Sequence, residues 1–295
     1  MLILDAIIPI ALVVIIGVLL VKSGYVSDGF FPELSKLVFR VFVPVFLFVS
    51  VYRSGLQDVG QTLIAYFVPV LVVFVAVALL MNHRMALTST FSNNVLVGIP
   101  VILSVAGEQG LTITLAVISA HSLILFSAFY LFSTKVNVTP SKFKASMNLF
   151  SNPVIIGLLL GLAFNYSGIE LPKQLMTPLE MVSEAALPLA LIILGSSLAQ
   201  MGKFKGHLLQ KTALITAIKL ILLPIVVYSF GRWVMELDEV VLISLVILAA
   251  CPTGISVMPF VEAVEQDKQI AHSTIALTTL LSVVCIPVTI WLVQG

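Results

Sequence analysis

Long apolar runs separated by short polar breaks fill the chain from end to end. Ten of these runs approach or exceed the roughly 20 mostly apolar residues that a membrane-spanning helix needs. They cover residues 2–21, 31–52, 60–81, 86–106, 110–133, 148–166, 175–200, 207–231, 239–264 and 270–293. The breaks leave no room for a separate soluble domain. The pattern therefore predicts an all-α integral membrane protein with ten transmembrane helices.

Composition agrees with this pattern and narrows the choice of partners. Hydrophobic residues make up 60% of the 295 positions and charged residues only 10%, with a mean hydropathy of +1.16. A soluble domain carries about 25% charged residues, so the lipid bilayer is expected to surround most of this chain. A net charge of +1 argues against a nucleic-acid partner, which would need a basic face. The first run lacks a basic segment before it and a cleavage site after it, which favours a permanent helix over a signal peptide.

The longest polar connection, residues 133–148, divides the ten runs into two sets of five. We expect a first repeat at 1–134, a cytoplasmic linker at 135–147 and a second repeat at 148–295. Because five is odd, the second copy would enter the membrane from the opposite side, as in the inverted repeats of secondary transporters. A shift of the sequence by 144 residues supports the repeat, since it matches five helix-breaking or turn residues: Pro9 with Pro153, Gly17 with Gly161, Ser23 with Ser167, Gly24 with Gly168, and Pro44 with Pro188.

Lysine and arginine in the connections predict the orientation. Nine basic residues follow the odd-numbered runs and three follow the even-numbered runs. The larger set is expected to face the cytoplasm, which places both termini outside the cytoplasm in a plasma (inner) membrane protein. The nine are Lys22, Arg84, Lys135, Lys142, Lys144, Lys203, Lys205, Lys211 and Lys268, and the three are Arg53, Lys173 and Arg232.

Two runs in matching positions of the two sets contain residues that interrupt helices. The fourth reads SNNVLVGIPV at 92–101, which predicts a break near Gly98–Pro100. The ninth reads AACPTGISVMPFVEAVEQ at 249–266, which predicts breaks at Cys251–Gly254 and at Pro259. Each motif alone is equally compatible with an ordinary kink, and asparagine often bonds a neighbouring helix. Interrupted helices in matching positions favour a binding site, because a half-helix N-terminus attracts anions.

Three stretches give the chain a resemblance to the auxin efflux carrier family. NNVLVGIPVILSVAGEQG resembles the fourth helix of that family, CPTGISVMPFVEAVEQD with STIALTTLLSVVCIPV resembles its ninth and tenth helices, and SKLVFRVFVPVFLF resembles its second. Bacterial members include transporters of malonate and other carboxylates, and the fold resembles that of the bile-acid/sodium symporters. The resemblance implies a scaffold of helices 1, 2, 6 and 7. It also implies a transport core of helices 3–5 and 8–10, in which broken helices 4 and 9 cross.

The resemblance also implies a set of substrate-binding residues. Asn93, Gly98 and Pro100 match the family's site in helix 4, and Pro252 and Gly254 match the crossover in helix 9. Their neighbours complete the candidate set: Asn94, Ile99, Cys251 and Thr253. The chain departs from the plant auxin carriers in a longer spacing between the two helix 9 prolines and in lacking a long central loop, so auxin is a poor candidate substrate.

Three further polar residues are candidates for charge balance or proton coupling. Lys219 lies about 12 residues inside helix 8, or roughly 18 Å, which is too deep to reach the membrane surface easily. It could balance an anionic substrate or form a structural ion pair. His121 could relay a proton, although a hydrogen bond between helices is favoured. Glu108 matches a Gly-Glu turn of the family and is favoured as a helix cap.

These features predict a secondary active transporter, a permease or efflux carrier that moves a small organic anion by alternating access. A proton- or sodium-coupled carrier of a different small solute is the alternative. An intramembrane enzyme lacks support, because the chain has no His-Glu-x-x-His, Gly-x-Ser-x-Gly or aspartate-rich motif. A channel or receptor lacks a pore ring or an attached soluble domain. We therefore expect no catalytic residues, cofactor or metal, with energy from an ion gradient or the membrane potential; a homodimer is left open.

Overall fold

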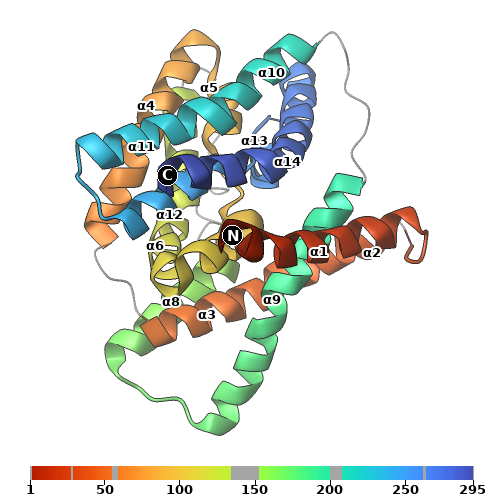
Figure 1. Cartoon of the computed structure of the whole chain (residues 1–295), viewed down its shortest axis with the longest axis vertical. Helices are drawn as coiled ribbons and strands as arrows, with labels where there is room; N and C mark the ends of the chain where they lie inside the picture. The colour runs from red at the N-terminus through yellow and green to blue at the C-terminus, as the bar shows by residue number, and fades with distance from the viewer. Residues whose placement is uncertain are drawn as a thin grey trace. The chain divides into compact units, whose positions relative to one another are not determined.

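A computed structural model describes residues 2–27, 29–54, 59–133, 153–199, 208–261 and 264–294. Within these ranges every regular element is helical (Figure 1). The one extended pairing in the described residues is an isolated bridge between Ser92 and Thr253. The all-α prediction is confirmed for this part of the chain. By length and apolar composition, six of its helices can cross a membrane: Phe30–Arg53, Gly60–Leu80, Asn94–Phe129, Lys173–Ser196, Leu209–Trp233 and Glu265–Gln294.

The helices form two compact units, which we describe separately. The paired-helix unit, 2–58 with 140–200, contains α1, α2, η1, α3, α8 and α9. The crossover unit is mainly 59–139 with 201–295 and contains the remaining elements. Each unit therefore draws its helices from both halves of the chain.

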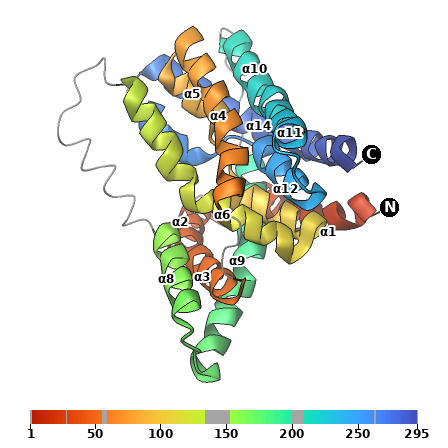
Figure 2. The ribbon, with the colours of Figure 1, turned by 90° about the vertical axis from the view of Figure 1, so that its left-hand side faces the viewer.

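The paired-helix unit is built on two close helix pairs. Helix α1 (Leu2–Lys22) packs on α9 (Lys173–Ala199). Helix α3 (Val43–Ser54) packs on α8 (Pro153–Ser167), as Figure 2 shows. Helices α2 (Phe30–Leu37) and η1 (Val38–Phe42) precede α3. Glycine permits the close approach, because a Cβ on Gly17 would lie 2.0 Å from the Ile192 oxygen and one on Gly195 1.9 Å from the Val14 oxygen. Small residues at helix contacts are the usual way for membrane helices to pack.

The turns that end α1 and α8 repeat each other in atomic detail. Gly24 has a φ of 64° and Gly168 a φ of 65°, a left-handed conformation that glycine adopts without strain. The Ser23 hydroxyl donates to the Leu20 oxygen at 3.3 Å, and the Ser167 hydroxyl donates to the Phe164 oxygen at 3.0 Å. In both turns the residue after glycine donates its N–H to the serine oxygen at 3.4 Å. Residues 144 apart thus have the same local structure, while the inverted topology stays a prediction.

The crossover unit surrounds a helix that is buried over most of its length. Residues Leu242–Ala250 of α12 (Glu239–Ala250) are all buried, and α6, α11 and α14 pack around this helix (Figure 2). An apolar helix with no exposed stripe in its second half belongs in the interior of a bundle. The other elements of the unit are α4 (Val59–Leu80), α5 (His83–Thr90), η2 (Asn94–Gly98), α6 (Ile99–Ser133), α10 (Leu209–Ala217), η5 (Ile218–Leu222), α11 (Leu223–Trp233), η6 (Ile255–Val257), α13 (Met258–Val261) and α14 (Glu265–Gln294).

Three π-helical turns share one cause. The turns η1, η2 and η5 each end two residues before a proline, namely Pro44, Pro100 and Pro224. Proline has no N–H for the carbonyl four residues earlier, and its ring crowds that carbonyl. In each case the residue before the proline donates instead to the oxygen five residues back, which widens the turn. These prolines are therefore accommodated inside continuous helices.

The predicted break near Gly98–Pro100 is wrong for this reason. Gly98 ends the π turn, Pro100 lies in the first turn of α6, and the real interruption is the extended stretch 91–93. The predicted interruption at Cys251–Gly254 is present, between α12 and η6. Pro259 does not break a helix either, because it is the second residue of α13, where its missing N–H is harmless. Further along, the fourth and fifth predicted helices are joined at Gly107, whose φ of 60° kinks α6.

Candidate functional site

The two interruptions of the crossover unit bond to each other. The N–H of Asn93 donates to the oxygen of Pro252 at 2.8 Å, and the N–H of Gly254 donates to the oxygen of Phe91 at 3.0 Å. This pair of bonds makes the antiparallel bridge centred on Ser92 and Thr253. Buried backbone groups must find partners, so each interruption supplies what the other lacks. The interruption before η2 and the one after α12 therefore meet at this bridge, which we call the crossover.

The central residue of each interruption has a side-chain acceptor for its N–H. Ser92 donates to Nε2 of His121 at 3.2 Å, and Thr253 donates to Oγ1 of Thr278 at 3.1 Å. His121 in α6 and Thr278 in α14 thus play the same role, each accepting the N–H at the centre of one interruption. The Thr253 hydroxyl adds a bond to the oxygen of Thr88, at 2.9 Å. This geometry gives His121 a structural partner and leaves its Nδ1 buried with none in the described residues.

Lys219 is completely buried at the same crossover. Its ammonium donates to the Ser92 hydroxyl oxygen at 2.7 Å and to the main-chain oxygen of Ala249 at 2.6 Å. Ala249 lies in the last turn of α12, where the helix dipole places partial negative charge. Among the described residues no carboxylate lies within 4 Å of Lys219, so an ion pair is not what holds it. The ammonium is instead solvated by oxygens of both crossing segments.

The two adjacent asparagines have different environments. Asn93 is the N-cap of η2, and its Oδ1 accepts from the N–H of Leu96 at 3.3 Å. Asn94 is 3% exposed, and neither Oδ1 nor Nδ2 makes a hydrogen bond of normal geometry in the described structure. The Tyr66 hydroxyl is near this amide but donates to the Ser92 hydroxyl at 3.4 Å. The amide with unused capacity is therefore that of Asn94, at the start of a half-helix.

The glycines and Cys251 of the candidate set bring backbones together. A Cβ on Gly98 would lie 2.9 Å from Leu248 Cδ2 and 3.4 Å from the Cys251 sulfur, so the half-helix rests directly on the end of α12. A Cβ on Gly254 would lie 3.0 Å from the Phe91 ring. Cys251 is buried with a free thiol. Ile99 and Pro100 are also buried, in the first turn of α6.

Glu108 is not part of this arrangement. It is exposed just after the kink at Gly107, and about 20 Å of helix separates it from Asn94. The Thr112 hydroxyl donates to its main-chain oxygen at 3.1 Å, which involves no carboxylate. The structure thus brings His121 and Lys219 to the crossover and leaves Glu108 outside it.

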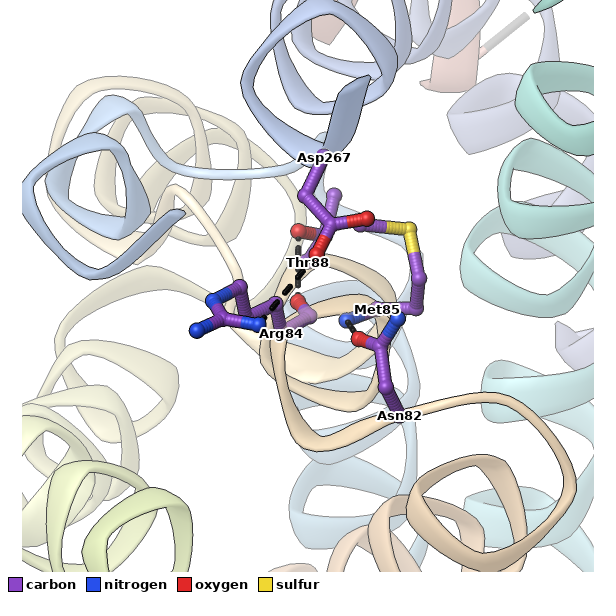
Figure 3. Close-up of polar contacts among 5 residues, drawn as sticks. All are labelled: Asn82, Arg84, Met85, Thr88 and Asp267. Atoms are coloured by element: carbon purple, nitrogen blue, oxygen red, sulfur yellow. Dashed lines mark hydrogen bonds and ion pairs between the residues drawn. The ribbon is translucent and has the colours of Figure 1, made fainter. Parts of the chain in front are cut away.

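A second polar cluster connects α5 with the start of α14 (Figure 3). A guanidinium N–H of Arg84 lies 3.5 Å from Oδ2 of Asp267, a carboxylate that is 7% exposed. Asn82 caps α5 by accepting from the N–H of Met85 at 2.8 Å, and the Thr88 hydroxyl donates to the Arg84 oxygen at 2.8 Å. Since Thr88 also accepts from Thr253, α5 links this ion pair to the crossover.

His83 stands beside this cluster, outside the apolar spans. Burial, and then the positive charge of Arg84, lowers the pKa of His83 below its usual value. Its ring packs edge-on against Phe129 with centroids 4.9 Å apart. A neutral imidazole is therefore favoured next to the Arg84–Asp267 pair.

Sequence reasoning missed several residues of the crossover. Ser92 is the exception that had a signal, because it begins the polar run before the predicted break. The others look like ordinary helix residues until the two halves of the chain are brought together: Tyr66, Thr88, Ala249 and Thr278.

Apolar helices of spanning length, together with two interrupted helices that bond to each other around a buried lysine, define an integral membrane protein of the transporter class. The chain belongs to the membrane transport protein family, whose family model matches residues 2–291. It is similar to an uncharacterized transporter of Methanothermobacter thermautotrophicus, with 24% identity over 301 residues that cover 96% of each chain. Family membership agrees with the resemblance seen in the sequence at this coarser level. The family is one of transporters rather than enzymes.

Proposed function

We propose that the chain is a secondary active transporter that moves a small organic anion, a carboxylate, by alternating access. The observation that carries this proposal is the antiparallel bond between the two interruptions at Ser92 and Thr253. It ends α12 in the interior of the crossover unit and starts the η2–α6 half-helix there. A half-helix N-terminus offers free N–H groups and partial positive charge to an anion.

The charges at the crossover support an anionic substrate. Lys219 brings a full positive charge to the bridge, and no acidic group of the described residues pairs with it. The unused amide of Asn94 lies at the start of the half-helix and supplies both a donor and an acceptor. A carboxylate that binds beside Asn93 and Val95, the half-buried residues at the start of this half-helix, would meet the partial charge directly and the Lys219 charge through the bridge.

The proposal includes an architecture for the whole chain. It comprises ten transmembrane helices in two inverted repeats, 1–134 and 148–295, joined by the cytoplasmic linker 135–147. Helices 1, 2, 6 and 7 would form the scaffold, and helices 3–5 and 8–10 the moving core. The nine-to-three distribution of basic residues supports a plasma membrane location with both termini outside the cytoplasm. Coupling to a proton or a sodium ion and assembly as a homodimer are both compatible with this architecture.

Uptake by purified protein in liposomes tests the proposal. Labelled malonate, malate, lactate and indole-3-acetate are offered in turn, each with an imposed proton gradient, a sodium gradient or neither. We expect uptake of at least one small carboxylate above the level of empty liposomes, and competition by the other substrates ranks them. Uptake of a neutral solute with no competition by any carboxylate would contradict an anion transporter.

A further inference from the structure

The end of α1 carries an amphipathic cavity that the transport proposal does not use. Its volume is about 520 Å³, and it lies wholly within the paired-helix unit. One part of its wall is apolar, formed by Ile16, Leu19 and Leu20, and the other part is polar, formed by Lys22, Ser23 and Tyr25. Tyr25 is 82% exposed, an unusual state for a large aromatic side chain. The wall of the cavity thus changes from apolar to cationic over the last two turns of α1.

We propose that this cavity binds an anionic glycerophospholipid. The acyl chain would lie along the apolar wall, where Ile16 and Leu19 are exposed. The phosphate would meet the Lys22 ammonium and the Ser23 hydroxyl, and the Tyr25 ring would lie at headgroup depth, where aromatic residues of membrane proteins gather. A basic residue at a helix end binds anionic lipids in preference to neutral ones. We therefore expect the bound lipid to have a negatively charged headgroup.

Comparison of the turn after α1 with the turn after α8 shows which residues the turn itself requires. The turn that ends α8 has the same glycine conformation and the same serine hydrogen bonds, yet it carries Tyr166 where α1 has Lys22 and Ile169 where α1 has Tyr25. The backbone therefore needs neither the ammonium nor the phenol. In the described residues Lys22 also has no acidic group within 4 Å. Its charge remains available to a headgroup.

The location of the cavity agrees with this ligand. The charge distribution of the connections predicts that the end of α1 lies on the cytoplasmic side, the leaflet that carries anionic lipids. The turn after α8, which lacks the cation, is predicted on the opposite side. This inference does not depend on the transport proposal, since it concerns a lipid and a different unit of the protein.

The test compares lipid binding by purified full-length variants. Native mass spectrometry counts phosphatidylglycerol molecules retained in competition with phosphatidylcholine, and the melting temperature is followed as phosphatidylglycerol is added. We expect Lys22→Gln to weaken phosphatidylglycerol binding about fivefold, the effect of one basic residue near an anionic surface. Tyr25→Leu should weaken it to a smaller extent, and Lys22→Arg should retain it.

A matched control is Lys173→Gln, which removes an exposed lysine of the same unit outside the cavity. We expect phosphatidylglycerol binding by this variant to equal that of the unmodified protein. Equal loss in Lys22→Gln and Lys173→Gln would overturn the site, because it would indicate attraction to total charge alone. Equal stabilisation by soluble glycerol phosphate would overturn the lipid as occupant. If Lys22→Gln fails to fold, the comparison between Tyr25→Leu and Lys22→Arg decides: unchanged binding in Tyr25→Leu contradicts the proposal.

Discussion

The Lys219 ammonium donates to the main-chain oxygen of Ala249 at 2.6 Å, which places a full positive charge at the C-terminal end of a buried helix. The same ammonium donates to Ser92 on the other crossing segment. One side chain therefore joins the end of α12 to the interruption of the fourth helix. Because protein encloses this ammonium, it would attract an anionic substrate by long-range electrostatics and would not touch it.

Replacement of Lys219 should reveal this structural role. Lys219→Met keeps an unbranched side chain that is one atom shorter, and it loses two hydrogen bonds donated by a charged group, each contributing about 1.5–3 kcal/mol. Relief of the buried charge offsets part of that loss. We expect a net decrease of about 1–3 kcal/mol in the free energy of unfolding, measured by reversible denaturation in detergent. Unchanged stability together with weaker substrate binding would instead assign the charge to the substrate.

His121 should tolerate a substitution that keeps a hydrogen-bond acceptor. In His121→Gln the amide oxygen can still accept from the N–H of Ser92, so we expect transport to persist with an unchanged pH profile. In His121→Leu that N–H is left without a partner, and we expect a loss of about 1–3 kcal/mol of stability. Transport is measured in liposomes between pH 5.5 and 8. A flattened pH profile in well-folded His121→Gln would mean that the imidazole carries protons.

We expect substitution of Asn93 to affect mainly stability and substitution of Asn94 to affect mainly substrate binding. Asn93→Ala removes an N-cap, so we expect the free energy of unfolding to fall by about 0.5–2 kcal/mol. Asn94→Ala removes an amide that makes no hydrogen bond of normal geometry, so stability should change little. If the amide of Asn94 contacts the substrate, this variant should bind it about tenfold more weakly, as measured by calorimetry. Normal affinity in Asn94→Ala would remove this residue from the site.

Glycine at the contact between α1 and α9 should be irreplaceable. A methyl group on Gly195 would lie 1.9 Å from a backbone oxygen, so the two helices must separate. We expect Gly195→Ala to lose about 1–3 kcal/mol of stability, the usual effect of overpacking. Gly60→Ala is the control, because nothing lies within 4 Å of its Cβ position and alanine favours a helix. Equal melting temperatures for the two variants would contradict the close packing of α1 on α9.

The orientation can be tested by labelling single cysteines. With Cys251 and Cys285 replaced, a cysteine at Lys142 or Lys203 should react only from the cytoplasmic side, and one at Lys173 only from outside. Lys142 and Lys203 lie outside the described residues, so labelling supplies what the structure does not. Reaction of positions 142 and 173 from the same face would rule out both the ten-helix count and the inverted repeats.

An interruption of a helix could be predicted from the sequence when the residues that cause it lie within the interruption itself. The interruption at Cys251–Gly254 was predictable, because Pro252 and Gly254 disfavour a helix locally. The turns at Gly24 and Gly168 were predictable as a repeat for the same reason. The stretch 91–93 contains no proline or glycine, and its extended form depends on bonds to Pro252 and Gly254 from the other half of the chain. Local sequence therefore pointed to Pro100, which the π turn accommodates.

For the candidate site, the sequence identified unusual single residues but not the partners that they contact. Asn93 and Asn94 stood out as polar residues in an apolar run, but only the structure distinguishes a capping amide from an unused one. Lys219 stood out by depth, yet its partners are a serine and a main-chain oxygen, which no charge pattern indicates. Arg84 and Asp267 gave no signal as a pair, since nothing in the sequence brings the start of α5 to the start of α14.

The π turn η5 determines which side of the continuous helix α10–η5–α11 faces the interior of the crossover unit. Thr212 and Gly231 are both buried, and between them lie Ile215, Lys219, Leu223 and Val227, also buried. Five turns of a regular α-helix advance about 18 positions, whereas Gly231 is 19 positions after Thr212. The wide turn takes up the extra residue, so one face of the helix stays inward along its whole length. Loss of one residue from 218–222 would thus allow a regular helix with both ends in phase, whereas loss of one from α10 or α11 would rotate half of the buried face into lipid.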